Sequence, residues 1–346
     1  MKRWQLALGV VALIAIGVFA FRGAIVERIL VAAVTRIMTA DPLADFPDGL
    51  HVVLCGAGSP LPDPIRSGPC VAVVAGRKLF LVDAGSAASR NLQAVGLPTA
   101  LLDAVFLTHF HSDHIDGLGE LALQHWVGSN AREPLALFGP TGVGEIAAGL
   151  RQVYRADTNY RIAHHGEDIA PRSGAGLSPR PFVPPDAGEP LVVWDTDGVR
   201  ITAFRVDHEP VDPAVGYRFD YAGRSAVITG DTKKSAEIAR IAKGADLLVH
   251  EALSARLVGI MEAAATTAGQ QRRAKIMKDI QDYHATPVDA AETAAAAGVG
   301  HLLFYHVVPP LIAPGMESSF LRGVSDAYSG QITLGRDGTR VSLPAT

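Results

Sequence analysis

Cysteine is nearly missing from this chain of 346 residues, which contains only two. A small secreted domain held together by several disulfides is therefore excluded, and so is a metal site built from clustered thiolates. Cys55 and Cys70 lie on what are predicted to be neighbouring strands, so a disulfide between them is one alternative in an oxidising compartment. We expect buried free thiols instead.

Lysine is also scarce, and the formal net charge is −4. A broad nucleic-acid surface needs clustered lysine and arginine to neutralise phosphates. The segment 161–190 is rich in glycine and proline, lacks clear periodicity and contains no lysine, and we interpret it as a long loop or insertion. These features predict that the chain has no nucleic-acid partner.

One long hydrophobic run is present, at the N-terminus. After two basic residues, the segment 4–21 is uncharged and almost wholly apolar, which is close to the minimum length for a membrane span. A cleaved signal peptide is the alternative. We expect residues 1–22 to be an uncleaved transmembrane anchor, because the run is longer than a usual signal core. The catalytic domain would then lie outside the cytoplasm, in the periplasm, or be secreted if the segment is cleaved.

Residues 23–49 are predicted to form an amphipathic helix and a linker, followed by one catalytic domain at 50–346 without internal repeats. Within this domain, 217–229 has the alternation and central turn of a β-hairpin. The segments 331–334 and 339–343, around a glycine-rich turn, predict a second, closing hairpin.

Metal-binding side chains are concentrated in the segment 109–114, which reads H-x-H-x-D-H. It follows a strand-like apolar segment and precedes a helix start, so it lies on a strand-to-helix loop. Imidazole and carboxylate are preferred ligands of zinc, and burying this many of them without partners is expensive. Its four candidate ligands are His109, His111, Asp113 and His114.

These four side chains can hardly converge on one ion, so we expect them to divide between two metals. Further ligands are then needed, and His208, Asp231 and His306 each lie at or just past the end of a predicted strand. Three ligands for each metal would leave one carboxylate to bridge the two ions. Asp231 is the candidate for that bridge.

The ordered set of motifs resembles the metallo-β-lactamase-fold hydrolases, and within them the ribonuclease Z and arylsulfatase branch. The matching segments are 55–60, 81–85, 109–114, His208, 230–232, 283–286 and 304–306. The resemblance implies an α/β (α+β) fold, an αβ/βα four-layer sandwich, here preceded by the N-terminal transmembrane helix.

The resemblance also implies two zinc ions, with manganese or iron as alternatives. One ion would be held by His109, His111 and His208, the other by Asp113, His114 and His306, with Asp231 as the bridge. In the branch that this chain resembles, the histidine of the 283–286 motif assists the leaving group, which gives His284 that role. Packing of His284 beside a helix cap at Thr286 is the alternative.

Four further roles complete the predicted site. Asp113 would bind metal and also orient the nucleophile. Asp83 and Glu251 would orient ligand histidines through hydrogen bonds. Arg66 would neutralise an anionic substrate.

The function expected from these observations is a binuclear zinc-dependent hydrolase of sulfate or phosphate esters. It would resemble an arylsulfatase or phosphodiesterase, use a metal-bridging hydroxide and act on a small anionic ester. A lactonase or β-lactamase is one alternative, and a ribonuclease Z-type endonuclease is another. The intact ligand set argues against a binding protein without catalysis, and a homodimer is compatible with the sequence.

Overall fold

The structure is a computed structural model that describes residues 3–346, with the backbone alone for residues 3 and 6–16. The chain divides into two compact units, Met1–Asp45 and Phe46–Thr346. The second unit contains every candidate site residue.

The first unit is built around one long helix, α1 (Arg3–Thr39), which includes the predicted amphipathic segment. Among the described residues, no helix is long and apolar enough to cross a membrane. From Gly17 onward the apolar sequence of this helix is interrupted by Arg22, Glu27, Arg28 and Arg36, and charged side chains are costly in hydrocarbon. The prediction of a transmembrane anchor, and with it a membrane-bound periplasmic domain, is wrong on this finding. Part of this prediction rests on residues 1–2 and on the side chains of residues 6–16, which lie outside the described residues.

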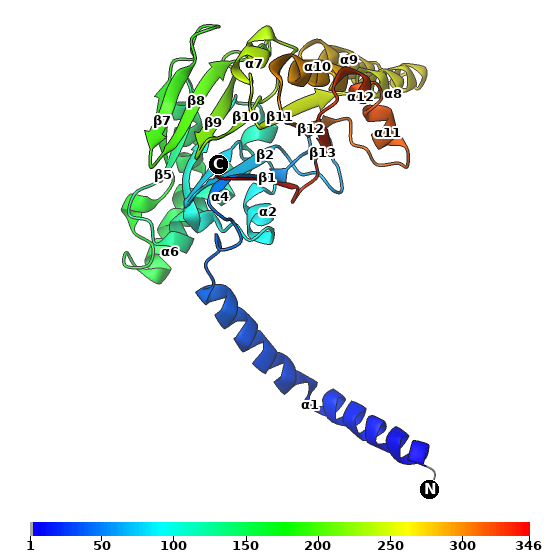
Figure 1. Ribbon diagram of the computed structural model, residues 1–346. Helices are drawn as coiled ribbons and strands as arrows, with labels where there is room; N and C mark the ends of the chain where they lie inside the picture. The colour runs from blue at the N-terminus through cyan, green and yellow to red at the C-terminus, as the bar shows by residue number, and fades with distance from the viewer. Residues whose placement is uncertain (1–2) are drawn as a thin grey trace. The chain divides into compact units, whose positions relative to one another are not determined.

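The second unit contains two seven-stranded sheets (Figure 1). The first has the order β14-β1-β2-β3-β4-β5-β6 and the second β13-β12-β11-β10-β9-β8-β7. The strands of the first sheet are β1 (Gly49–Gly56), β2 (Cys70–Ala75), β3 (Lys78–Val82), β4 (Leu102–Phe106), β5 (Leu135–Pro140), β6 (Leu177–Phe182) and β14 (Arg340–Pro344). Those of the second are β7 (Leu191–Thr196), β8 (Val199–Arg205), β9 (Val215–Tyr221), β10 (Arg224–Ile228), β11 (Leu247–Leu253), β12 (His301–Val308) and β13 (Gln331–Leu334).

The main core lies between the two sheets. Aromatic side chains of both sheets meet there, with the rings of Phe106 and Tyr217 5.4 Å apart and those of Phe80 and Phe219 6.1 Å apart. The strand β2 is a continuous apolar run because both of its faces are buried.

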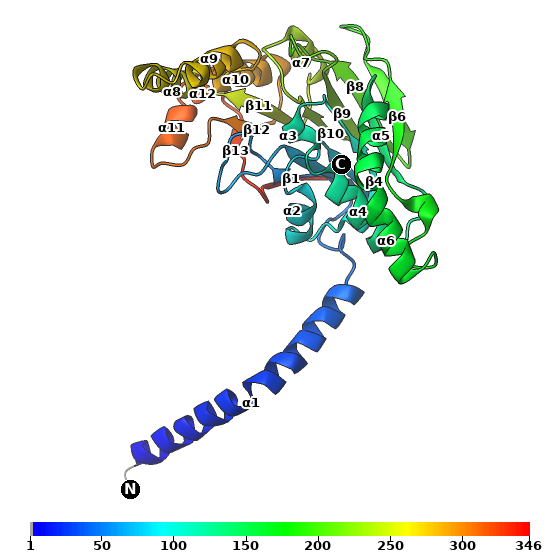
Figure 2. The same cartoon turned by 180° about the vertical axis from the view of Figure 1, so that it is seen from behind.

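Helices cover the outer faces of the sandwich. Figure 2 shows α4 and α5 against the first sheet, and α10 packs on β11 and β12 of the second. The helices of this unit are α2 (Ala88–Ala94), α3 (Ser112–Ile115), α4 (Leu118–Ser129), α5 (Val143–Val153), α6 (Arg155–His165), α7 (Ala236–Ile241), α8 (Ala255–Thr267), α9 (Gln271–Asp279), α10 (Pro287–Ala297), α11 (Met316–Phe320) and α12 (Val324–Ala327). The short 3₁₀ helices are η1 (Thr99–Leu101), η2 (Arg172–Gly174) and η3 (Ile280–Asp282). The predicted α/β two-sheet sandwich is therefore confirmed.

Of the two predicted hairpins, one is correct. β9 and β10 pair in antiparallel register, but β13 pairs with β12 in the second sheet while β14 pairs with β1 in the first. The turn between β13 and β14 bridges the sheets, because Gly335 N donates to Phe304 O and Gly338 N donates to Leu54 O. The closing hairpin was therefore a wrong prediction.

Two further expectations are corrected. The segment 161–190 is not one long loop, because it contains the end of α6, η2 and the strand β6, which pairs in parallel with β5. Cys55 and Cys70 are joined by a disulfide rather than being free thiols. The two residues lie at adjacent positions where β1 pairs with β2, so the register of these strands brings their side chains together.

Candidate metal centre

The H-x-H-x-D-H segment begins three residues after the end of β4 and runs into α3. His109 and His111 lie on the loop, whereas Asp113 and His114 lie in the single turn of α3. The loop is fixed by the buried carboxylate of Asp83, which accepts hydrogen bonds from Thr108 N at 2.8 Å and Thr108 Oγ1 at 2.9 Å. The side chains that follow Thr108 are thereby directed toward one edge of the sandwich.

The second sheet brings three further side chains to the same edge. His208 follows β8 and Asp231 follows β10, while His306 lies within β12. The register of β11 and β12 shifts at His306, whose φ is +43°. A bulge of this kind redirects a side chain, and it turns His306 toward Asp113 and Asp231.

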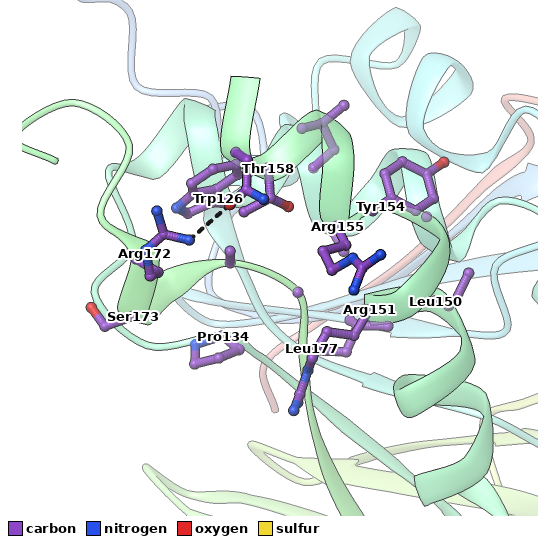
Figure 3. Close-up of a pocket in the computed structure, with 16 residues that line it drawn as sticks. Trp126, Pro134, Leu150, Arg151, Tyr154, Arg155, Thr158, Arg172, Ser173 and Leu177 are labelled. Atoms are coloured by element: carbon purple, nitrogen blue, oxygen red, sulfur yellow. Dashed lines mark hydrogen bonds between the residues drawn. The ribbon is translucent and has the colours of Figure 1, made fainter. Parts of the chain in front are cut away.

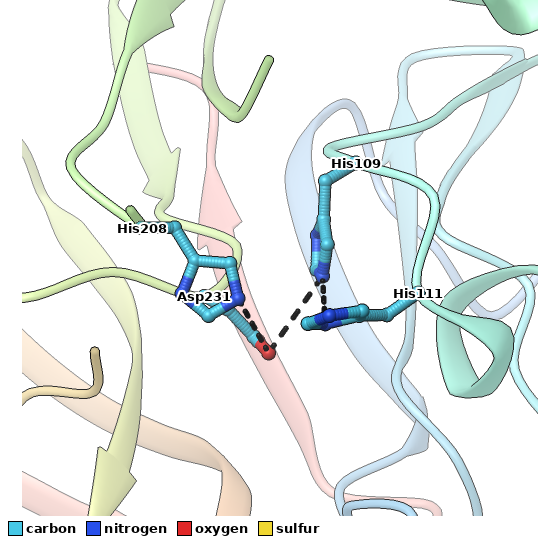
Figure 4. A group of neighbouring side chains, drawn as sticks. All are labelled: His109, His111, His208 and Asp231. Atoms are coloured by element: carbon cyan, nitrogen blue, oxygen red, sulfur yellow. Dashed lines mark hydrogen bonds and ion pairs between the residues drawn. The ribbon is translucent and has the colours of Figure 1, made fainter. Parts of the chain in front are cut away.

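The first group of candidate ligands consists of His109, His111, His208 and Asp231 (Figure 4). One ligand atom of each lies within 4.8 Å of the others. His109 Nε2 is 3.0 Å from His111 Nδ1, and the Nε2 atoms of His109 and His208 are each 3.9 Å from Asp231 Oδ2. These nitrogens and this oxygen surround a volume suited to one cation.

The second group consists of Asp113, His114 and His306. His306 Nε2 is 3.3 Å from both Asp113 Oδ2 and Asp231 Oδ2, and His114 Nε2 is 3.4 Å from Asp231 Oδ1. Asp231 therefore faces both groups with its two carboxylate oxygens. The structure brings all seven residues together at one edge of the sandwich.

Unpaired buried atoms show that the groups fit metal ions. Among the described residues, His114 Nε2, His208 Nε2 and Asp231 Oδ1 are buried and have no hydrogen-bond partner. Leaving such atoms unpaired is costly, whereas a cation bound by imidazole nitrogen and carboxylate oxygen would satisfy them. This cluster could hold metal ions.

Hydrogen bonds fix the orientation of the candidate ligand histidines through their other ring nitrogens. His114 Nδ1 donates to Asp83 Oδ2 at 2.8 Å, and His208 Nδ1 donates to the carbonyl oxygen of Tyr283 at 2.9 Å. His109 Nδ1 is 3.0 Å from Thr108 Oγ1. Such contacts select the ring tautomer and leave the opposite nitrogen for a metal. Asp83 was anticipated in this role, but Thr108 and the Tyr283 carbonyl were not, because backbone and hydroxyl acceptors leave no pattern in the sequence.

The electrostatic environment favours the ionised form of Asp231 and the neutral form of His109 and His208. Burial would raise the pKa of Asp231, but His306 and His114 hold it well below its ordinary range. Burial lowers the pKa of His109 and of His208. A charged carboxylate and neutral imidazoles are the protonation states that metal binding requires.

Glu251 contacts His284 rather than one of the predicted ligand histidines. Its Oε1 accepts from His284 Nδ1 at 3.0 Å, and also from the backbone N–H groups of Thr232 and Ala285, each at 3.1 Å. Burial would lower the pKa of His284, but the Glu251 carboxylate raises it above its ordinary value. The pair therefore favours the protonated form of His284 beside the candidate ligands.

A cleft of about 240 Å³ opens onto the cluster. His111, Asp113, Asp231, His284 and His306 line one part of it. The apolar side chains that line it are Leu61, Ile276, Met277, Ile280 and Val308. A substrate in this cleft would therefore meet the candidate ligands and His284 together.

Comparison with known proteins identifies the family. The profile described as the metallo-beta-lactamase superfamily matches residues 64–343. The chain belongs to this superfamily. It is also 40% identical over 298 residues to a protein named Ribonuclease Z from Mycobacterium avium strain 104, covering 86% of this chain and 99% of that protein. This relationship places the metallo-β-lactamase-fold chain in the ribonuclease Z branch and makes it a metal-dependent hydrolase.

Solved structures share the fold at lower sequence identity. The metallo-beta-lactamase fold protein YhfI from Bacillus subtilis has a TM-score of 0.61 and 20% identity, over 85% of this chain and 99% of that one. The short form of human tRNase Z has a TM-score of 0.59 and 20% identity, with the same coverage of both chains. These likenesses concern the fold alone.

The relatives overturn three predictions. Two proteins that are 40% identical to this chain, over 86% and 85% of its length, are named Ribonuclease Z. The expected arylsulfatase-like action on sulfate or phosphate esters, the small anionic ester substrate and the absence of a nucleic-acid partner are therefore wrong. The net charge gave a wrong prediction about nucleic acid because it sums the charges of the whole chain, whereas a substrate contacts only one part of the surface.

Arg66 is engaged by other groups of the chain. Its side chain is buried, Nε donates to the carbonyl oxygen of Gly335 at 2.9 Å, and the terminal nitrogens pair with Asp63 at 3.6 Å and Glu317 at 3.3 Å. These contacts already compensate the guanidinium charge. They give Arg66 a structural role and do not support its prediction as a substrate-binding residue.

Gly230, next to Asp231, offers a test of how tightly the loop is packed. Its φ is +65°, and an added Cβ would lie 2.8 Å from Thr108 Cβ. We expect Gly230→Ala to lower the free energy of unfolding by about 2–4 kcal/mol and to weaken metal binding. Thermal unfolding and metal titration measure both effects.

Gly244→Ala is the matched control, because Gly244 has a φ of +66° and nothing within 4 Å of an added Cβ. It should cost only about 1 kcal/mol, the price of the backbone conformation, with unchanged metal binding. Equal losses in the two variants would show that contact with Thr108 does not matter.

Chelation tests whether metal satisfies the buried cluster. Because metal binds the folded chain and not the unfolded one, removing it should lower Tm by about 5–10 °C, and adding zinc should restore Tm. Differential scanning calorimetry before and after dialysis against a chelator makes the measurement. An identical Tm in both states would contradict a metal-filled cluster.

Proposed function

We propose that this chain is a metal-dependent ribonuclease of the ribonuclease Z type, which hydrolyses phosphodiester bonds in RNA. The observation that carries the proposal is 40% identity to Ribonuclease Z over 99% of that protein. The clustered ligands and the cleft beside them are consistent with it, because the reactive groups and the substrate space coincide.

The residues that would hold two zinc ions are the two groups described above. His109, His111 and His208 would bind one ion, Asp113, His114 and His306 the other, and Asp231 would bridge them. When bound, such ions supply activated water and stabilise negative charge on the attacked phosphorus group.

Two side chains would act on the substrate directly. The Asp113 carboxylate lines the cleft and would orient the attacking water by accepting its hydrogen bond. His284 lines the same cleft and would donate its proton to the leaving oxygen of the cleaved ester. Glu251 positions His284, since it accepts the hydrogen bond from Nδ1 and leaves Nε2 for the substrate.

The test is RNA cleavage by the purified full chain loaded with zinc. The substrates are a transfer-RNA precursor transcript, an unstructured RNA, a DNA strand of the same sequence and an aryl phosphodiester. We expect zinc-dependent cleavage of RNA and none of the DNA strand. A zinc-loaded, folded protein that leaves both RNAs intact would overturn the proposal, whatever its action on the aryl ester.

A further inference from the structure

A second cavity of about 430 Å³ lies outside the candidate metal centre (Figure 3). Its walls come from α4, the end of α5, the start of α6 and the segment 172–177. None of the candidate metal ligands lines it, and neither does His284. The cavity is within the size range of sites that bind small organic molecules.

The inner surface of the cavity is apolar and rigid. Leu123, Trp126, Leu150 and Leu177 line it, and the Trp126 side chain is almost fully buried. Trp126 Nε1 donates to the carbonyl oxygen of Pro171 at 2.7 Å, which fixes the indole ring. A preformed apolar wall of this kind favours a hydrophobic ligand body.

Three arginines contribute positive charge to the lining of the cavity. The lining contains Arg151, Arg155 and Arg172 and no aspartate or glutamate. Arg172 is partly engaged, with Nε 3.5 Å from a Glu167 oxygen and NH1 donating to Asn159.

Arg151 and Arg155 are the lining arginines whose guanidinium groups are available to a ligand. Both are exposed, and they stand one helical turn apart in sequence, at the end of α5 and the start of α6. Among the described residues, neither forms an ion pair with a carboxylate. Two unpaired guanidinium groups beside an apolar cavity favour an anion with an apolar body.

We propose that this cavity binds an amphipathic organic anion, whose acyl or aryl body occupies the apolar part and whose carboxylate or phosphate contacts Arg151 and Arg155. The site goes beyond the proposed RNA hydrolysis, since it shares no lining residue with the cleft beside the metal cluster. A bound RNA strand is less suited to it, because sequence-independent strands follow an extended cationic groove with stacking platforms.

Calorimetric titration of the full chain with decyl phosphate tests the proposal. We expect saturable binding at one site, with no binding of inorganic phosphate, which lacks the apolar body, or of decyltrimethylammonium, which reverses the charge. Comparable binding of the cation would overturn the proposal, because the arginines would then play no part.

Three variants locate the site. R151Q combined with R155Q should weaken decyl phosphate at least about tenfold, since each lost charge-assisted contact is worth more than a neutral one. A175F, at a lining residue, should abolish binding by filling the cavity. R322Q replaces an exposed arginine elsewhere and should leave binding unchanged.

RNA hydrolysis is measured on the same variants, so that failure of this inference is distinct from failure of the proposed function. The double arginine variant should cleave RNA within about twofold of the unchanged chain, because it leaves the metal cluster intact. Unchanged decyl phosphate binding in both R151Q/R155Q and A175F would overturn the site. A large loss of RNA cleavage in the double variant, with no decyl phosphate binding by the unchanged chain, would assign the cavity to RNA instead.

Discussion

Asp231→Asn is expected to lower the metal content of the chain and to reduce RNA hydrolysis at least about a thousandfold. The Asp231 carboxylate faces both sets of candidate ligands, with Oδ2 3.9 Å from His109 Nε2 and Oδ1 3.4 Å from His114 Nε2. Asparagine keeps the shape of the side chain but removes the negative charge that two cations would share. Metal analysis by mass spectrometry and single-turnover cleavage measure the two effects.

The control for this variant is Asp195→Asn. Asp195 is an exposed carboxylate that pairs with Arg200 at 2.8 Å on the far strand β7, so its loss should change neither metal content nor cleavage. If Asp231→Asn kept full metal content and activity, a bridging role for this carboxylate would be refuted.

His284→Ala should lower kcat by about 10²–10⁴-fold, the usual contribution of a general acid, while leaving metal content unchanged. The prediction rests on the position of His284 in the cleft and on its hydrogen bond to Glu251. His164→Ala, at an exposed position at the end of α6, is the control and should have no effect. Loss of metal in His284→Ala would instead indicate a ligand.

Glu251→Gln distinguishes proton donation by His284 from a merely structural contact. His284 acts in its protonated form, so activity should fall as pH rises through its pKa. Against burial, the Glu251 carboxylate raises that pKa, and removing its charge should lower it. The alkaline limb of the kcat–pH profile should therefore move to lower pH. Gln can still accept the hydrogen bond, so an unshifted limb would exclude His284 as the titrating acid.

Several candidate ligands could be predicted from the sequence because they lie in short motifs or directly after clear strand patterns. The H-x-H-x-D-H segment places four candidate ligands within one loop, and His208 and Asp231 follow strands whose apolar pattern is plain. Parallel neighbours such as β10, β11 and β12 bring the residues that follow them to one edge. Strand order therefore places Asp231 at this edge, whereas His306 reaches it through the bulge in β12.

The features that the sequence did not predict depend on contacts between residues that are distant in the sequence. Arg66 pairs with Glu317 and donates to the carbonyl oxygen of Gly335, and neither residue is near it in the chain. The separation of β13 from β14 follows from hydrogen bonds to Phe304 and Leu54 on different sheets. The Cys55–Cys70 disulfide depends on the register of β1 against β2. None of these has a local pattern.

The most direct test of the account titrates zinc into the metal-free chain while RNA cleavage and metal content are measured on the same sample. The ligand groups predict that cleavage reaches its plateau at two zinc ions per chain and that Asp231→Asn reaches no plateau. Full RNA cleavage at one zinc per chain would contradict the two-ion site, and no RNA cleavage at two would contradict the proposed ribonuclease.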